Sequence, residues 1–232
     1  MIARCLQRHV GCCRSCLVRP RRALPPISLA PDCANLTCAA RDRALPLLFV
    51  DAPVLPAAAL EELAWLVGLT EQAGAEPTSL EQRTLGLITL RDVVMHRQQE
   101  RAACLALVLR CTVHSDDALR GKSIRMVVNQ LHPLPFAARD IEHFASERLD
   151  SLAQLTADEA AMDDEAASAA AQARTEEALR RISLCFALCT RAEALLPRLF
   201  SAFAASDAAV QLAFHRNMVR RASFVLDALG RR

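Results

Sequence analysis

Residues 101–135, RAACLALVLRCTVHSDDALRGKSIRMVVNQLHPLP, are the stretch of the sequence that decides the fold. Residues 102–113 are apolar almost all round, which is expected of a helix buried between neighbours. A second apolar set recurs at the spacing of one helix face: Ile124, Val127, Val128 and Leu131. Three residues that can cap a helix stand between the two segments: Ser115, Asp116 and Asp117. The stretch therefore predicts two helices joined by a tight turn, the second of which ends at Pro133 and Pro135.

A single helical hairpin cannot bury its apolar surface, so this unit needs another hairpin on each side. The acidic turn followed by Leu119 and Arg120 resembles the HEAT repeat, an antiparallel helix pair with an Asp near the turn and a hydrophobic-Arg dipeptide at the start of the second helix. We therefore predict an all-α fold in which antiparallel helical hairpins stack as a HEAT-like α-solenoid.

The composition favours packed helices over a sheet. The chain of 232 residues is 53% hydrophobic but only 4% aromatic, with six Gly and no Tyr, and Ala and Leu dominate. The formal net charge is +2, yet residues 1–43 hold eight Arg against two Asp, so the remainder is slightly acidic. Such a body gives no reason to expect strong phosphate binding. No apolar run approaches the roughly 18 residues that span a bilayer, so we expect no membrane role.

The first 43 residues differ in kind from the rest. They contain Cys5, Cys12, Cys13, Cys16, Cys33 and Cys38, and they show no helical stripe. We interpret residues 1–43 as a disordered Arg/Cys-rich leader. Two alternatives remain open. The two-residue gap between Cys13 and Cys16, with the pair Cys33 and Cys38, could supply a four-cysteine zinc site. The basic, acid-poor composition also fits a transit peptide.

The next part, residues 44–155, reads as one HEAT-like helical unit. Pro53 and Pro56 interrupt its first apolar segment, and residues 72–77 form a loop. Thr78 or Ser79 then caps a helix that runs to about His96. We expect this helix to bury Leu80, Leu87, Leu90, Val94 and Met95. A further helix after Phe136 should bury Ile141, Phe144, Leu149 and Leu152.

Residues 156–177 are Ala-rich and acidic, and Met162 is their only large apolar residue. With so little to bury, this segment is interpreted as a solvated linker, partly helical at best, between two packing units. Residues 178–232 form the second helical unit, whose last helix, opened by Ser206 and Asp207, carries Val210, Phe214 and Met218. Ser206 and Asp207 repeat the Ser-Asp turn at Ser115 and Asp116, which indicates a second repeat of the same sort.

Few residues suggest chemistry. His114 with Asp116 and Asp117 could be drawn as a metal site, but a turn capped by Asp is the commoner reading. His215-Arg216 could contact a phosphate, although a helix-surface pair or a His in an inter-repeat groove is preferred. Cys104, Cys111, Cys185 and Cys189 lie in apolar helices and are read as core residues. The chain contains no nucleophile elbow, phosphate-binding Gly loop or zinc-hydrolase helix, so nothing argues for an enzyme.

Two longer blocks carry a family resemblance. The first, residues 111–149, contains an ordered set: Arg120, Lys122, Ile124, Arg125, Asn129, Leu131, Pro133 and Leu134. The second, residues 184–216, contains Phe186-Ala187-Leu188-Cys189-Thr190 and later His215-Arg216. Both blocks resemble the middle region of symplekin, the scaffold of the machinery that cleaves and polyadenylates messenger-RNA precursors. Two departures are Arg191-Ala192, where a Lys pair is usual, and Asn217-Met218, where the family continues Gln-Ile-Pro.

The resemblance implies a non-catalytic scaffold without cofactors, in the nuclear mRNA 3′-end cleavage and polyadenylation complex. Its partners would be cleavage and polyadenylation factor subunits, with RNA contacted only indirectly. Symplekins are several times longer, so the chain looks like a fragment or a truncated gene model. We expect Arg120, Lys122 and Arg125 to lie on the solvent side and form the partner-binding face. The alternatives are a zinc- or RNA-binding protein that uses the basic Cys-rich N-terminus, and an organellar helical-repeat protein.

Overall fold

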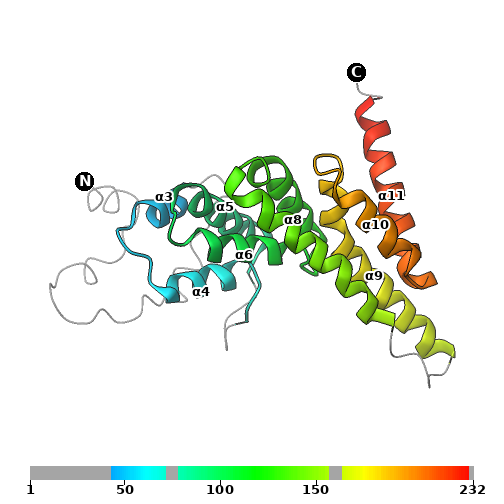
Figure 1. The fold of residues 1–232 in the computed structure, drawn as a ribbon. Coiled ribbons are helices and arrows are strands. Elements are labelled where there is room, and N and C mark those ends of the chain that lie inside the picture. The colour runs from blue at the N-terminus through cyan, green and yellow to red at the C-terminus, as the bar shows by residue number, and fades with distance from the viewer. Residues whose placement is uncertain (1–42, 72–77, 157–163, 230–232) are drawn as a thin grey trace.

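All regular structure in the described part of the chain is helical, as the sequence predicts. The computed structural model describes residues 43–71, 78–156 and 164–229. The predicted leader, with its zinc-site and transit-peptide alternatives, lies outside the described residues except for Arg43. Helices α3 and α11 lie at opposite ends of the molecule (Figure 1).

The N-terminal helices form where the prolines allow. Helix α3 (Ala44–Asp51) ends before Pro53, and Pro56 is the N-cap of α4 (Ala57–Leu66). Arg97 holds the end of α3, because its guanidinium donates to the carbonyl oxygens of Phe49 at 3.4 Å, Val50 at 3.3 Å and also Ala52. The same guanidinium forms a two-pronged ion pair with Glu100, at 3.0 Å for each bond.

Ser79, one of the two predicted capping residues, is the N-cap of helix α5 (Leu80–His96). The Ser79 hydroxyl accepts from the Gln82 N–H, and the Gln82 side chain accepts from the Ser79 N–H, which completes a capping box. Leu87, Leu90 and Val94 are fully buried. Leu80 and Met95 were wrongly expected inside: they are 40% and 41% exposed. Leu80 is the first residue of α5, and Met95 faces solvent although its neighbour Val94 is fully buried.

The deciding stretch forms the predicted pair of helices, α6 (Arg101–Cys111) and α7 (Asp117–Met126). Helix α7 runs directly into a π-helical turn, η1 (Val127–Leu131), which the sequence did not predict. Such turns are rare and shift the face that a helix presents. Pro135 starts the next helix, α8 (Pro135–Asp150), so the two prolines separate η1 from α8.

The predicted linker is wrong for residues 164–177. After the short 3₁₀ helix η2 (Ser151–Thr156), the chain forms one long helix, α9 (Asp164–Leu188), while residues 157–163 lie outside the described part. Alanine has the highest helix propensity, and α9 packs against both α8 and α11. Helices α10 (Leu195–Ala204) and α11 (Ala208–Leu229) complete the fold. The buried apolar residues form one cluster from Phe49 to Phe214, so the core is continuous across the predicted unit boundary.

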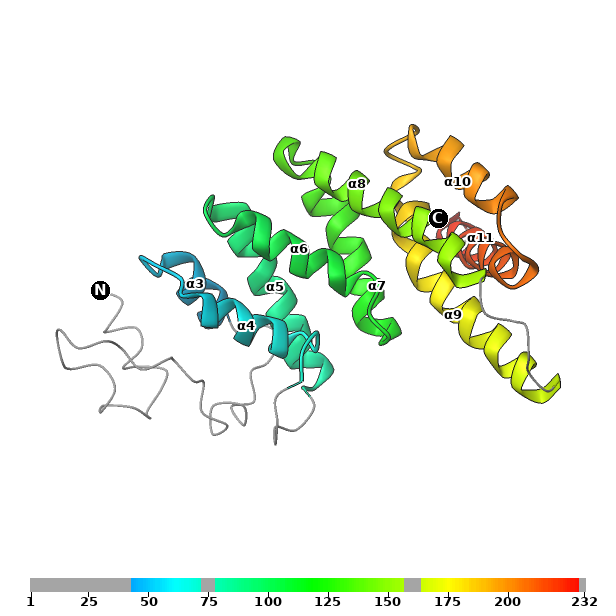
Figure 2. The same cartoon turned by 60° about the horizontal axis from the view of Figure 1, so that its bottom comes forward.

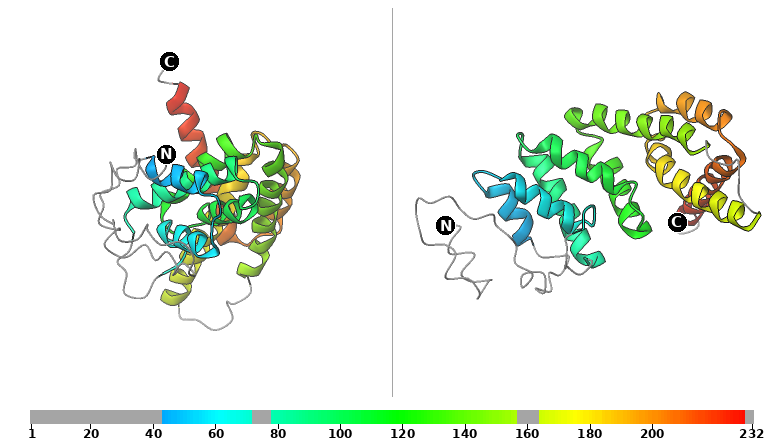
Figure 3. Two further views of the ribbon diagram at one scale, coloured as in Figure 1. Left: turned by 90° about the vertical axis from the view of Figure 1, so that its left-hand side faces the viewer. Right: turned by 90° about the horizontal axis from the view of Figure 1, so that it is seen from below.

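The helices form two layers (Figure 2). Helices α4, α6, α8 and α10 contact one another in succession, and α5, α7, α9 and α11 do the same in the second layer. The molecule is accordingly elongated (Figure 3).

Helices α5 and α7, which are neighbours in the second layer, run parallel. Lys122 on α7 donates to the Thr84 hydroxyl on α5 at 2.8 Å, and Arg91 on α5 donates to Gln130 at 3.1 Å. The two residues of each pair are 38 and 39 positions apart in the sequence. Because this separation is nearly the same at two points along α5, the two helices must run in the same direction.

Candidate partner-binding surface

In the turn between α6 and α7, Asp116 caps helix α7, as the sequence analysis preferred over a metal site. The Asp116 carboxylate accepts from the Ala118 N–H at 2.9 Å and from the Leu119 N–H at 3.3 Å, so it closes the first turn of α7. Desolvation raises the pKa of the Asp116 carboxyl. The hydrogen bonds from the Leu119 and Ala118 N–H groups and the nearby charge of Arg83 outweigh this effect, so the pKa of Asp116 is lower than its ordinary value.

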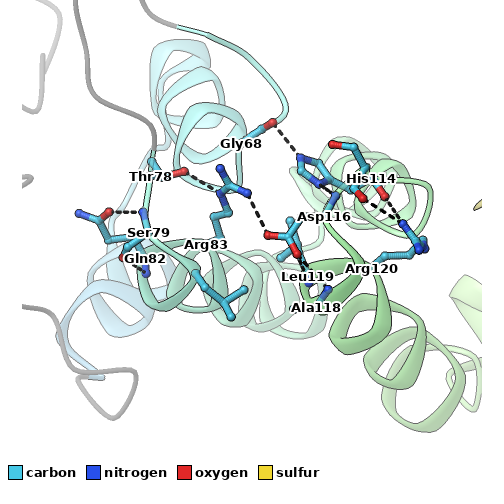
Figure 4. Close-up of polar contacts among 12 residues, drawn as sticks. Gly68, Thr78, Ser79, Gln82, Arg83, His114, Asp116, Ala118, Leu119 and Arg120 are labelled. Atoms are coloured by element: carbon cyan, nitrogen blue, oxygen red, sulfur yellow. Dashed lines mark hydrogen bonds and ion pairs between the residues drawn. The ribbon is translucent and has the colours of Figure 1, made fainter.

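Asp116 also joins two hairpins (Figure 4). Arg83 on α5 donates to the Asp116 carboxylate at 3.1 Å and to the Thr78 hydroxyl at the same distance. His114 lies beside this pair, where its Nδ1 accepts from the Asp116 N–H at 2.9 Å. Its Nε2 lies 3.1 Å from the Gly68 carbonyl oxygen and must therefore carry the ring proton. His114 and Asp116 thus both make hydrogen bonds within the fold.

Arg120 is not on the solvent side, so that part of the predicted face is wrong. Its side chain is only 8% exposed. The guanidinium donates to the carbonyl oxygens of His114 at 2.7 Å and Ser115 at 3.3 Å, and it pairs with Asp117. The hydrophobic-Arg dipeptide places Arg120 one turn after the cap, where its side chain folds back over the turn. Arg120 therefore stabilises the turn.

Lys122 and Arg125 do reach the surface. Lys122 is half-buried and Arg125 is exposed. Lys122 donates to the Thr84 hydroxyl and has no carboxylate partner among the described residues. Arg125 donates only to the Gly121 carbonyl oxygen, at 3.1 Å. Lys122 is also the single lysine of the sequence, which makes it a selective chemical handle.

The π-helical turn extends this surface to a third cation. Asn129 and Gln130 are both exposed on η1. Asn129 accepts from exposed Arg191, beyond the end of α9, at 3.2 Å, while Gln130 accepts from Arg91 on α5. Lys122, Arg125 and Asn129 are spaced as one helix face. We call Lys122, Arg125 and Arg191 the basic strip; no carboxylate of the described chain forms an ion pair with any of them.

The Arg83–Asp116 contact recurs at the other end of the molecule. Arg174 on α9 donates to Asp207 at 3.4 Å, and Asp207 caps α11 by accepting from the Val210 N–H at 2.8 Å. Both Arg–Asp pairs span 33 residues. Gln211 takes the place of Arg120, because it donates to the carbonyl oxygen of Ser206 at 2.9 Å.

Every residue of this second set stands 91 positions after its counterpart. The sequence analysis used only the repeated Ser-Asp turn and missed both arginines. The signal was present as an Arg-Thr pair, Arg83-Thr84 and Arg174-Thr175, before each turn.

Three of the four cysteines that the sequence predicts as core residues are buried in the core. Cys104, Cys111 and Cys185 are fully buried, and Cys189 is half-buried. Burial raises the pKa of Cys104 and of Cys111 to about 12. A hydrogen bond with Cys189, followed by burial, raises the pKa of Cys185. These thiols stay protonated at neutral pH, which disfavours nucleophilic or ligand roles.

His215 and Arg216 form the predicted helix-surface pair. Both residues are exposed. The His215 ring packs edge-on against the Phe203 ring, with 5.7 Å between the ring centroids, and the Arg216 guanidinium pairs with the Glu176 carboxylate on α9 at 3.4 Å. On the other layer, a shallow groove of about 340 Å³ lies between α6 and α8, with Leu105, Leu109 and Phe144 along it.

None of the helices in the described ranges is both long and apolar enough to cross a membrane. Within the same ranges, no three metal-ligating side chains gather at one point. Comparison of the chain with protein-family models, with curated proteins and with solved structures finds no match.

Proposed function

We propose that the chain is a non-catalytic scaffold built as a HEAT-like α-solenoid, and that it serves in the nuclear mRNA 3′-end cleavage and polyadenylation complex. The solenoid is supported by the two layers of successive helices and by the parallel course of α5 and α7. The recurrence of the Arg–Asp contact between neighbouring helices of the second layer supports it independently. Placement in this complex rests on the sequence resemblance to symplekin.

The single observation that carries a binding role is the basic strip. Lys122, Arg125 and Arg191 have no carboxylate partner among the described residues, whereas eight other arginines of the described residues form ion pairs with Asp or Glu. A partner surface that carries carboxylates would complement these charges. Lys122 and Arg125 belong to the block that resembles symplekin, so the revised partner-binding face keeps them and replaces Arg120 with Arg191.

The test is co-purification of cleavage and polyadenylation factor subunits with the tagged full chain. Arg125→Glu should abolish recovery of these subunits and leave the helical circular dichroism unchanged, because Arg125 is exposed and makes only one bond to its own helix. Arg139→Glu is the matched control, since Arg139 is an exposed arginine on α8 outside the basic strip.

Amine-reactive labelling adds a direct readout. Lys122 is the only side-chain amine, so its labelling should fall at least several-fold when the partner is bound. Unchanged recovery with Arg125→Glu, or Lys122 labelling that ignores the partner, would remove the basic strip from the binding surface. Absence of every factor subunit from the wild-type purification would instead remove the assignment to this complex.

A further inference from the structure

The polar contacts that link neighbouring hairpins are of two kinds. At the helix caps the acceptor is a carboxylate, in the pairs Arg83–Asp116 and Arg174–Asp207. Along the basic strip the acceptor is neutral. Lys122 donates to the Thr84 hydroxyl at 2.8 Å, and Arg191 donates to the Asn129 side-chain oxygen at 3.2 Å. A carboxylate cancels the charge of the cation that it holds, whereas a hydroxyl or an amide holds a cation and leaves its charge in place.

The second unit shows that the missing carboxylate is particular to the basic strip. Arg216 stands 91 positions after Arg125, and it pairs with Glu176 on α9 at 3.4 Å. The residue 91 positions before Glu176 is Leu85, which is 2% exposed. The position that supplies a carboxylate to Arg216 therefore holds a core residue in the first unit, and Arg125 keeps its full charge.

The basic strip is short enough for one segment of a partner chain. Lys122 and Asn129, the residue that holds Arg191, are seven positions apart. At about 1.5 Å per helical residue, about 10 Å separates them along the helix axis. An extended chain rises about 3.3 Å per residue, so a run of about four acidic residues covers that length. Its carboxylates would meet cations from α7 and from the chain after α9 at once.

The surroundings of the strip favour an acidic peptide over RNA. Single-stranded RNA is held by aromatic side chains that stack on its bases and by many cations that contact its phosphates. Residues 117–131, which form α7 and η1, include no aromatic residue, and the strip has three cations. The chain after residue 43 is slightly acidic as a whole, which repels a long polyanion more than it repels a short peptide.

We infer that the basic strip binds a short run of Asp and Glu residues in a partner protein, and that Asn129 is a positioning residue that keeps the strip charged. This role rests on the proposed function and names the chemistry of the segment bound at the same site. Asn129→Asp places a carboxylate where Arg191 now meets an amide oxygen. The change strengthens a contact within the fold and cancels charge that the acidic segment needs, so stability and binding should respond in opposite directions.

The test uses the full chain and an N-acetylated peptide of eight Glu residues. Because residues 1–43 hold eight Arg, the readout must be local, and Lys122 provides it as the only side-chain amine. Saturating peptide should slow amine-reactive labelling of Lys122 at least several-fold, and about 0.2 M added salt should remove most of this protection. Peptide mass spectrometry separates labelling of Lys122 from labelling of the N-terminal amine.

Three variants locate the effect. Asn129→Asp should raise the peptide concentration for half-maximal protection by about tenfold or more, while its Tm equals or exceeds that of the wild type. Arg125→Gln removes one cation of the strip and should also weaken protection, and it decides if Asn129→Asp does not fold. Gln154→Glu is the matched control, because it adds one negative charge at an exposed residue of η2, which carries no residue of the strip. Protection in this control should equal that of the wild type.

Labelling of Lys122 that ignores the peptide in the wild type overturns the inference, as does undiminished protection in Asn129→Asp. Stronger protection by a ten-nucleotide uridylate RNA than by the peptide would assign the strip to RNA and overturn it as well. Co-purification separates these results from the proposed function. If the peptide protects Lys122 but no cleavage and polyadenylation factor subunit is recovered, only the assignment to that complex fails. If subunits are recovered in an Arg125-dependent way while the peptide gives no protection, only the acidic segment fails.

Discussion

The Arg83 guanidinium lies 3.1 Å from the Asp116 carboxylate, and this ion pair joins α5 to the first turn of α7. Asp116 is at once the N-cap of α7 and the acceptor for the preceding hairpin. Asp116→Ala should therefore lower the free energy of unfolding by about 1–3 kcal/mol, combining a lost cap with a partly exposed ion pair. For a chain of this size, that corresponds to roughly 2–4 °C in Tm per kcal/mol.

Asp116→Asn is the matched control for the cap, because Asn caps as well as Asp but carries no charge. It should retain most of the stability that Asp116→Ala loses. Equal losses in urea unfolding for the two variants would show that the ion pair with Arg83 dominates the cap.

The second ion pair should respond in the same way. Asp207→Ala removes the cap of α11 and the contact with Arg174, so it should cost a similar amount to Asp116→Ala. Because the two sites are distant, the double variant should lose the sum of the single losses within about 0.5 kcal/mol. Urea unfolding of the three variants measures this, and a negligible loss in Asp207→Ala alone would contradict equivalence of the two turns.

Arg120 and Lys122 should behave oppositely although they are two residues apart. Arg120→Ala leaves the carbonyl oxygens of His114 and Ser115 without their donor, which should cost about 2–3 kcal/mol. Arg120→Gln should cost less, because Gln211 serves the matching turn in the second unit. Lys122→Ala should change stability by no more than about 0.5 kcal/mol. If Lys122→Ala destabilised as much as Arg120→Ala, Lys122 would be a structural residue too.

Stability should fall in mild acid through Glu100. The two-pronged hydrogen bond from Arg97 holds the pKa of Glu100 below its ordinary value. The native state therefore binds fewer protons than the unfolded chain, whose Glu titrates near 4.3, so this contribution is complete above about pH 5. It is lost as the pH falls through the lowered pKa. Glu100→Gln should flatten the slope of unfolding free energy between about pH 5 and 3, and an unchanged slope would exclude Glu100 as its source.

The buried thiols should be inert in the native state. Cys104 and Cys111 have pKa values of about 12 because of burial, so little thiolate exists at pH 8. Maleimide labelling read by peptide mass spectrometry should leave both unmodified until urea unfolds the chain. Rapid labelling of Cys104 without urea would mean that α6 opens locally.

The sequence predicted helices well where apolar spacing and caps agreed. Ser79 with Gln82, and Asp116 before Ala118, place the starts of α5 and α7 because these caps act within one turn. Burial near the helix ends was harder to predict: Leu80 and Met95 are apolar, yet they are 40% and 41% exposed. Spacing along one helix does not say which of its faces a neighbour covers.

The basic strip was only partly predictable for a related reason. Arg120 and Arg125 look alike in sequence, but one folds back onto carbonyl oxygens of its own turn and the other does not. Arg191 joins the strip through Asn129, 62 residues earlier, on a π-helical turn that no local pattern indicates. Helix α9 was missed because alanine supplies helix propensity without the large side chains that mark a buried face.

The double use of Asp116 and Asp207 has a consequence for how the molecule comes apart. Each carboxylate caps its own helix through one oxygen and accepts from an arginine of the preceding second-layer helix through the other. The first turn of each helix and the contact between hairpins therefore share one side chain, which couples melting of that turn to loss of the contact. Amide hydrogen exchange should consequently advance inward from α11 in steps of whole hairpins, with no gradual fraying from residue to residue.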